Sequence, residues 1–248
     1  MWTEAALASE ARPYRRNVWR VVETQFRAAT MRITDTLEEQ AILEDVLEES
    51  KPALPPDCAG LHYLLATPFR YAPYPHGSRF RRAGQPEGAF YAAEALATAM
   101  AETAFNRLLF LAESPEMRVP QQPVEHTAFC ILCRTKRLVD LTRAPLDADR
   151  MRWTHVTDYA ACQDLADAAR GTGIEAIRYE SVRDPGHRAN LAVLAPACFT
   201  TRDPAEFRTW HVFPRRDAVQ AWCESPTEAI EYTSAQFATD PRLRPLST

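Results

Sequence analysis

Residues 88–113 read GAFYAAEALATAMAETAFNRLLFLAE, and the character of the chain changes within this stretch. Residues 88–91 form a short apolar and aromatic run, which predicts a strand. From Ala93 to about Glu113 the sequence is rich in alanine and leucine, both strong helix formers, so a long helix is predicted there. The stretch therefore predicts a strand that leads directly into a long helix.

The rest of the chain after residue 57 mixes short strands with helices in no regular order. A helix is predicted over about 158–170, closed by Gly171, because glycine is favoured at helix ends. No strand–helix–strand unit repeats, and there is no internal period. The pattern therefore predicts an α+β fold with a mixed or antiparallel sheet and flanking helices, and not a doubly wound fold. Further strands are predicted at 61–67, 127–133, 137–141, 174–179, 190–194 and 209–213.

The N-terminal part of the chain is predicted to be a helical extension that ends in a proline-rich linker. The spacing of apolar residues predicts an amphipathic helix over about 14–30. Three prolines between residues 52 and 56 then interrupt helical structure. We therefore predict two units, a helical extension with its linker over residues 1–56 and the main domain over residues 57–248.

A second helix within this extension is predicted to follow Asp35 or Thr36. Either residue can cap the helix, with Glu38 or Glu39 closing a capping box. One face of the helix is strongly acidic, and it is either a docking surface for a partner or a solvated helix face. Its acidic residues are Glu38, Glu39, Glu44, Asp45, Glu48 and Glu49.

The composition excludes several classes of protein. The chain has 248 residues, of which 46% are hydrophobic and 25% charged, so it is neither disordered nor fibrous. A formal net charge of −4 gives no overall attraction to nucleic acid or to an anionic membrane surface. The first residues are too charged for a signal peptide, and no apolar run approaches the ~20 residues that cross a bilayer. We therefore expect a cytoplasmic protein that binds neither nucleic acid nor membrane.

The cysteines predict buried thiols and no metal site. In the cytoplasm, six cysteines spread through a chain of this size are expected to be reduced. Cys130 and Cys133 form a CxxC pattern, but a three-residue offset within a strand places the two side chains on opposite faces. No second ligand pair follows at zinc-site spacing. Core packing is therefore favoured over metal binding.

A basic segment with glycines is a candidate for phosphate binding. Residues 58–86 contain no acidic residue, although the whole chain is acidic. Clustered arginines beside glycines suit a phosphate, because a guanidinium group pairs with two phosphate oxygens at once. A solvated basic loop is the alternative. The arginines of this segment are Arg70, Arg79, Arg81 and Arg82.

The chain lacks the standard motifs of nucleotide-binding proteins, hydrolases and zinc proteases, which leaves Glu102 as an unusual candidate residue. The chain has no GxGxxG, GxxxxGK[ST], GxSxG or HExxH pattern. One helical turn from Glu102 lie small and apolar neighbours such as Ala99 and Phe105, beside which a buried, unpaired carboxylate is costly. Glu102 is therefore either a functional carboxylate or an ordinary surface one.

Taken together, the motifs over roughly residues 60–200 resemble the RES domain, a family named for its Arg, Glu and Ser. The family forms the toxin half of RES–Xre toxin–antitoxin systems, and the N-terminal extension resembles that of longer members. One departure is the segment from Gly77 to Arg81, GSRFR, where many shorter members have GGRWN, so the asparagine is absent while the arginine keeps its place. The resemblance rests on PFRY (68–71), GSRF (77–80), FYAAEALATAMAE (90–102), YESVR (179–183) and NL (190–191).

The resemblance implies a fold related to the ADP-ribosyltransferases and an enzyme that consumes NAD+ as a substrate, with no resident cofactor and no metal. It implies catalytic roles for Arg79, Tyr91, Glu102 and Ser181. Inorganic phosphate is a possible second substrate. The residues expected to bind NAD+ or phosphate are Arg70, Ser78, Phe80, Arg183 and Asn190.

The resemblance also implies a reaction and a partner. The expected activity is that of an NAD+ phosphorylase or NAD+ glycohydrolase, which breaks the nicotinamide–ribose bond, and the additional arginines favour phosphorolysis over hydrolysis. Mono-ADP-ribosyl transfer to a protein and an inactive RES module acting as a binding scaffold are the alternatives. An Xre-type antitoxin is the expected partner, and a homodimer remains open.

Overall fold

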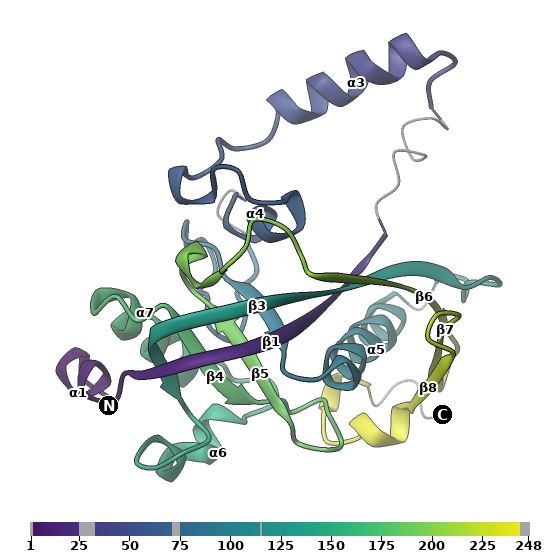
Figure 1. Cartoon of the computed structure of the whole chain (residues 1–248). Helices are drawn as coiled ribbons and strands as arrows, with labels where there is room; N and C mark the ends of the chain where they lie inside the picture. The colour runs from purple at the N-terminus through teal and green to yellow at the C-terminus, as the bar shows by residue number, and fades with distance from the viewer. Residues whose placement is uncertain (1, 25–32, 71–74, 115, 244–248) are drawn as a thin grey trace.

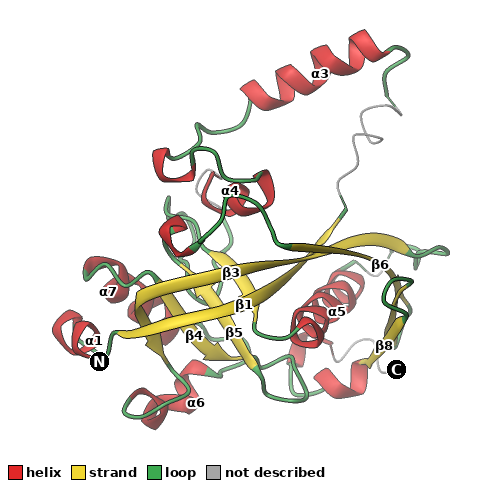
Figure 2. Ribbon diagram, viewed as in Figure 1, coloured by secondary structure: helices red, strands yellow, loops and turns green. Residues whose placement is uncertain are grey.

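The computed structural model describes residues 2–24, 33–70, 75–114 and 116–243 (Figure 1). It has the predicted α+β architecture, with one mixed sheet and helices packed around it (Figure 2). Long helix α5 (Leu96–Glu113) follows strand β2 (Phe90–Ala93) after two residues, as the sequence predicts.

The sheet has eight strands in the order β1-β2-β5-β4-β3-β6-β7-β8. Strand β1 also pairs with β3, so β1, β2, β5, β4 and β3 form a closed ring from which β6, β7 and β8 extend. Strands β3 and β4 run parallel and the other described pairs run antiparallel. The further strands are β1 (Arg12–Glu23), β3 (Val124–Asp140), β4 (Ala176–Glu180), β5 (Ala189–Val193), β6 (Glu206–Pro214), β7 (Ala218–Cys223) and β8 (Glu228–Thr233).

The helices bury three apolar clusters against this sheet. One cluster is shared by the strands of the ring and is covered by α4. A second lies under α1, α6 and α7, and a third joins α5 to β6, β7 and β8. Figure 1 shows α1, α6 and α7 gathered at one side of the sheet and α3 set apart from it. The remaining α-helices are α1 (Glu4–Ser9), α3 (Leu37–Glu49), α4 (Tyr63–Arg70), α6 (Arg150–Trp153) and α7 (Ala160–Gly171).

The predicted helix over 14–30 is wrong for its described residues, because residues 14–23 belong to strand β1. β1 pairs antiparallel with β3 from Arg12 to Glu23. Val18 packs into the cluster of the ring, whereas Trp19 packs against the cluster beneath α5. Apolar contacts on both faces remove the alternation of apolar and polar residues by which a strand is recognised. Residues 25–32 lie outside the described part, and the unit boundary at residue 56 stays a prediction.

Two further predictions need correction. Residues 61–67, predicted as a strand, fall mostly in helix α4, since a short apolar run fits either structure. The strands predicted at 127–133 and 137–141 are one continuous strand, β3. The second N-terminal helix is confirmed as α3, where the Thr36 hydroxyl accepts the backbone N–H of Glu39 at 3.1 Å.

All six cysteines are buried and free, so the prediction of thiols packed in the core is confirmed. Burial raises the pKa of the Cys130 and Cys133 thiols. Among the described residues no group of three or more His, Cys, Asp or Glu side chains is placed to hold a metal ion. Within that same part of the chain, no helix is long and apolar enough to span a membrane.

Candidate active site

A cavity of about 440 Å³ lies between β1, β2, α5 and the segment after β4. Its volume falls within the range of pockets that bind small ligands. Six of the residues predicted for the site line it, from segments far apart in the sequence. These are Ser78, Arg79, Tyr91, Glu102, Arg183 and Asn190.

The carboxylate of Glu102 is held at one oxygen. Oε1 accepts hydrogen bonds from Ser181 Oγ at 2.7 Å and from Asn190 Nδ2 at 2.6 Å. Among the described residues, Oε2 has no hydrogen-bond partner, and Glu102 lines the cavity. The carboxylate is therefore fixed in orientation while one oxygen remains available to a ligand.

Ser181 lies behind this carboxylate and is fully buried. Its hydroxyl donates to Glu102 and accepts the backbone N–H groups of Arg183 at 3.2 Å and Asp184 at 3.0 Å. The oxygen thus joins the turn after β4 to helix α5. Ser181 is not among the residues that line the cavity, so its place fits orientation of Glu102 and not contact with a ligand.

Arg79 is held by backbone groups and an aromatic ring. Its Nη1 donates to the carbonyl oxygens of Trp153 at 2.7 Å and His155 at 3.0 Å, and its guanidinium lies 4.5 Å from the centre of the Tyr159 ring. No carboxylate within the described ranges forms an ion pair with Arg79. Its positive charge therefore remains uncompensated at the wall of the cavity.

The phenol of Tyr91 ties the loop that carries Arg79 to strand β2. Its hydroxyl lies 2.8 Å from Ser78 Oγ and accepts the backbone N–H of Phe80 at 3.1 Å. Burial raises the pKa of Tyr91, so the phenol stays neutral at physiological pH. Phe80 does not line the cavity: its side chain is fully buried and packs edge-on against Tyr179.

Arg70 does not reach the cavity. It ends α4, where its Nε donates to the carbonyl of Pro52 at 2.6 Å and its Nη1 pairs with Glu48 of α3. The structure therefore does not bring Arg70 together with the predicted site residues that line the cavity. This arginine instead fastens α3 and the proline-rich linker to α4.

Several cavity residues were missed by the sequence analysis. Tyr179 on β4 belongs to a quoted motif but was given no role. Burial is the main cause that raises the pKa of Tyr179 well above its ordinary value, and the nearby charge of Glu102 raises it further. Tyr159 precedes α7 and carries no local signal. Arg20 was hidden by the incorrect helix prediction for its segment, and Arg242 follows the last strand.

The charges on the cavity wall favour an anionic ligand. Four arginines line it against one carboxylate, Glu102, although the whole chain has a net charge of −4. A local excess of positive charge in a concave site attracts anions such as phosphate groups. The four arginines are Arg20, Arg79, Arg183 and Arg242.

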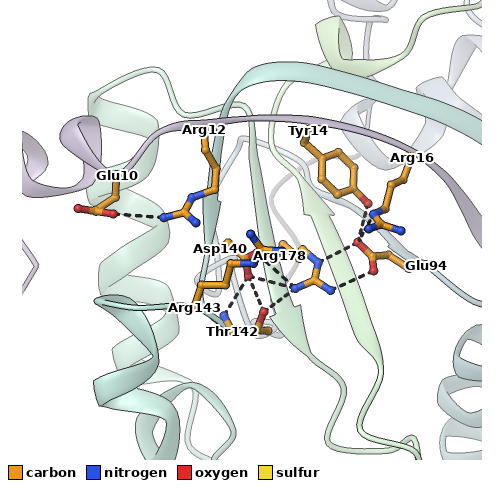
Figure 3. Close-up of polar contacts among 9 residues, drawn as sticks. All are labelled: Glu10, Arg12, Tyr14, Arg16, Glu94, Asp140, Thr142, Arg143 and Arg178. Atoms are coloured by element: carbon orange, nitrogen blue, oxygen red, sulfur yellow. Dashed lines mark hydrogen bonds and ion pairs between the residues drawn. The ribbon is translucent and has the colours of Figure 1, made fainter.

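An ionic network supports the elements that carry the site. Figure 3 shows Arg178 of β4 between Glu94 and Asp140. Arg178 donates to both carboxylate oxygens of Glu94, at 2.8 and 3.1 Å, and to both oxygens of Asp140. Glu94 lies between β2 and α5, so this bridge fixes the start of the helix that bears Glu102 relative to the strand that bears Tyr179.

These observations define an α+β protein whose cationic cavity holds one fixed carboxylate. The family model named RES domain matches residues 54–215, and the chain belongs to this family. Trp19, Arg20 and Val21 of the cavity precede the matched residues, and Arg242 follows them.

One solved structure is similar to this chain over most of its length. It is a crystal structure of the M. tuberculosis MbcT-MbcA toxin-antitoxin complex, with 12% sequence identity and a TM-score of 0.46. The similarity covers 94% of this chain and 95% of that chain. A search of curated protein sequences finds no match.

Proposed function

We propose that this RES domain protein is an enzyme that degrades NAD+ by breaking the bond between nicotinamide and ribose. The single observation that carries the proposal is the Glu102 carboxylate, held by Ser181 and Asn190 in a cavity whose other charged residues are arginines. A fixed negative charge suits a reaction that develops positive charge on a sugar carbon, and arginines suit a ligand that carries phosphates.

In the proposed reaction the nitrogen–carbon bond breaks, and nicotinamide leaves with the bonding electron pair as a neutral molecule. The anomeric carbon then carries oxocarbenium-like positive charge, which Glu102 Oε2 stabilises. An oxygen of inorganic phosphate forms the new bond in phosphorolysis and gives phosphorylated ADP-ribose. Water takes this place in hydrolysis and gives ADP-ribose and a proton. The excess of arginines supports phosphorolysis, because their positive charge can bind a second anion beside the phosphates of NAD+.

The test is to incubate the purified chain with NAD+, with and without phosphate, and to identify the products by mass. Glu102→Gln keeps the size of the side chain but removes its charge, so NAD+ consumption should fall at least about 100-fold. Glu113→Gln is the matched control, because Glu113 is an exposed residue of the same helix, outside the cavity. Undiminished turnover in Glu102→Gln contradicts the role of this carboxylate.

The product distinguishes this proposal from its alternatives. Mono-ADP-ribosyl transfer predicts that NAD+ with a tagged adenine labels a protein, whereas phosphorolysis and hydrolysis leave the tag on a small molecule. A binding scaffold predicts no loss of NAD+ under any phosphate condition. The cavity that brings Arg79, Glu102 and Asn190 together supports an enzyme over a scaffold.

We further propose that the enzyme is a toxin with an ADP-ribosyltransferase-like fold, neutralised by an Xre-type antitoxin that covers the cavity. Membership of the RES domain family supports this. Expression of the chain alone should then stop growth and lower cellular NAD+, and co-expression of the antitoxin should restore both. The cytoplasmic location and the homodimer stay predictions.

A further inference from the structure

Arg183 and Arg242 lie together at the cavity and share one carboxylate, that of Asp240. We propose that these two arginines form a phosphate-binding subsite, completed by the segment 240–242 beyond the residues that match the family model. The inference deepens the proposed function, because it assigns the ligand group that this part of the cavity accepts.

Asp240 fixes the two guanidinium groups. Its side chain is fully buried, and its Oδ2 lies 2.7 Å from Arg183 Nη2 and 2.7 Å from Arg242 Nη2. Arg242 Nε also donates to Oδ1 at 2.9 Å. Burial opposes the ionised form of Asp240, but hydrogen bonds from Arg242 hold its pKa below the ordinary value. The carboxylate is therefore ionised and orients both arginines.

Both arginines pack against one aromatic ring, that of Phe105. The guanidinium carbon of Arg183 lies 3.8 Å, and that of Arg242 5.4 Å, from the centre of the Phe105 ring. Phe105 belongs to α5, one turn after Glu102. The pair is thus fixed to the helix that carries the proposed catalytic carboxylate, and Phe105, Arg183 and Arg242 all line the cavity.

The cluster has positive charge left for a ligand. Within the group of Arg183, Arg242 and Asp240, two guanidinium groups share one carboxylate, which leaves these three side chains with one positive charge. Arg183 Nη1 is buried without a hydrogen-bond partner among the described residues, and burial lowers the pKa of this arginine. A buried donor without a partner is costly, and an arriving anion offsets that cost.

The geometry suits phosphate in particular. Arg242 has 34% of its side chain exposed and is therefore accessible from the cavity, whereas Arg183 is 4% exposed and preorganised. Guanidinium groups bind phosphate oxygens through charge-assisted hydrogen bonds, and donors that are already fixed lose little freedom on binding. The phosphate belongs either to the pyrophosphate of NAD+ or to inorganic phosphate.

The experiment measures binding of inorganic pyrophosphate to the whole chain by titration calorimetry, together with KM for NAD+ and for phosphate. The variants are Arg242→Gln, Arg242→Lys and the control Arg216→Gln, an exposed arginine between β6 and β7. Arg242→Gln should weaken pyrophosphate binding at least about 10-fold. Arg242→Lys should have an intermediate effect and Arg216→Gln none. Circular dichroism confirms that the variants are folded.

The outcomes separate the inference from the proposed function. A rise in KM for NAD+ alone assigns the subsite to the dinucleotide, and a rise in KM for phosphate alone assigns it to inorganic phosphate. Either result supports the inference. If the protein binds pyrophosphate through Arg242 but does not consume NAD+, the inference is also supported, and the proposed function fails. Absence of pyrophosphate binding in the unaltered chain, or binding and KM values unchanged in Arg242→Gln, overturns the inference.

Discussion

Ser181 donates a hydrogen bond of 2.7 Å from its hydroxyl to Glu102, across 79 residues of sequence. The same hydroxyl oxygen accepts two backbone N–H groups, so it joins a turn after β4 to the carboxylate on α5. Two elements that are distant in the chain thereby hold one functional group. Ser181 is fully buried and does not line the cavity, so it holds the Glu102 carboxylate from behind.

We expect Ser181→Ala to impair both stability and turnover. The substitution leaves two buried N–H groups without a partner, which should lower the free energy of unfolding by about 1–3 kcal/mol. Loss of orientation at Glu102 should lower kcat about 10- to 100-fold with little change in KM for NAD+. Urea unfolding and initial rates measure the two effects.

The control for Ser181→Ala is Ser50→Ala. Ser50 is exposed, and its hydroxyl donates to the carbonyl of Leu47, one turn earlier. It should change neither quantity. If Ser181→Ala lowers stability but leaves kcat unchanged, Ser181 is purely structural.

Arg178→Met should be strongly destabilising. The substitution leaves Glu94 and Asp140, which are 15% and 5% exposed, without their central cation. Loss of one partner from a mostly buried ion pair costs about 3–5 kcal/mol. Arg143→Met is the comparison, because Arg143 also pairs with Asp140 but is 66% exposed, and its loss should cost less than about 1 kcal/mol. Equal effects in urea unfolding would show that the network gives no more support than a surface pair.

The stability contributed by Asp184 should depend on pH. Burial alone would raise the pKa of this carboxyl, but hydrogen bonds from Arg188, Thr98 and the backbone of Gly186 lower it from 3.8 to about 2. A lowered pKa in the folded state means that the contribution is complete above pH 3.8 and is lost as the pH falls toward 2.

Asp184→Asn tests this dependence. The variant should be about 1–2 kcal/mol less stable than the unaltered chain at pH 7, after allowance for the partly exposed Arg188. The difference should shrink below pH 4 in urea unfolding series. A difference that stays constant down to pH 3 would assign the effect to packing and not to charge.

Gly88→Ala should disturb the strand that carries Tyr91. A β-carbon at this position would lie 2.1 Å from the carbonyl oxygen of Pro68, so the backbone of α4 or β2 must move. We expect a loss of about 3 kcal/mol in unfolding free energy. Gly84→Ala meets no atom within 4 Å but has a φ of +74°, and it should cost only about 1 kcal/mol. Similar losses in the two variants would contradict the close contact.

The sequence predicts those parts of the fold whose signals are local. The long run of helix formers in α5 and the cap at Thr36 are found where expected. Strand β1 was missed because apolar side chains lie on both of its faces: Val18 is buried against the ring, and Trp19 is partly buried against the α5 cluster. Such burial depends on neighbours that are distant in the sequence and leaves no period of two.

In the candidate site, too, residues with a local sequence signal were predicted and those placed by distant contacts were not. Arg79, Glu102 and Asn190 were found through motifs, and the structure brings them to one cavity. Arg70 was included because it is one of the arginines of the basic segment 58–86, but it ends a helix and pairs with Glu48 of α3. Arg242 was missed because only the packing of the last described residues against Phe105 brings it to the cavity.

The cavity is lined by residues from Trp19 to Arg242, and this range has a consequence during translation. While residues 240–242 are still inside the ribosome, Arg183 lacks its ion-pair partner Asp240 and the cavity wall is unfinished. A nascent chain therefore cannot assemble the complete pocket. Under the proposed function, a product truncated by premature termination before Asp240 should not degrade NAD+.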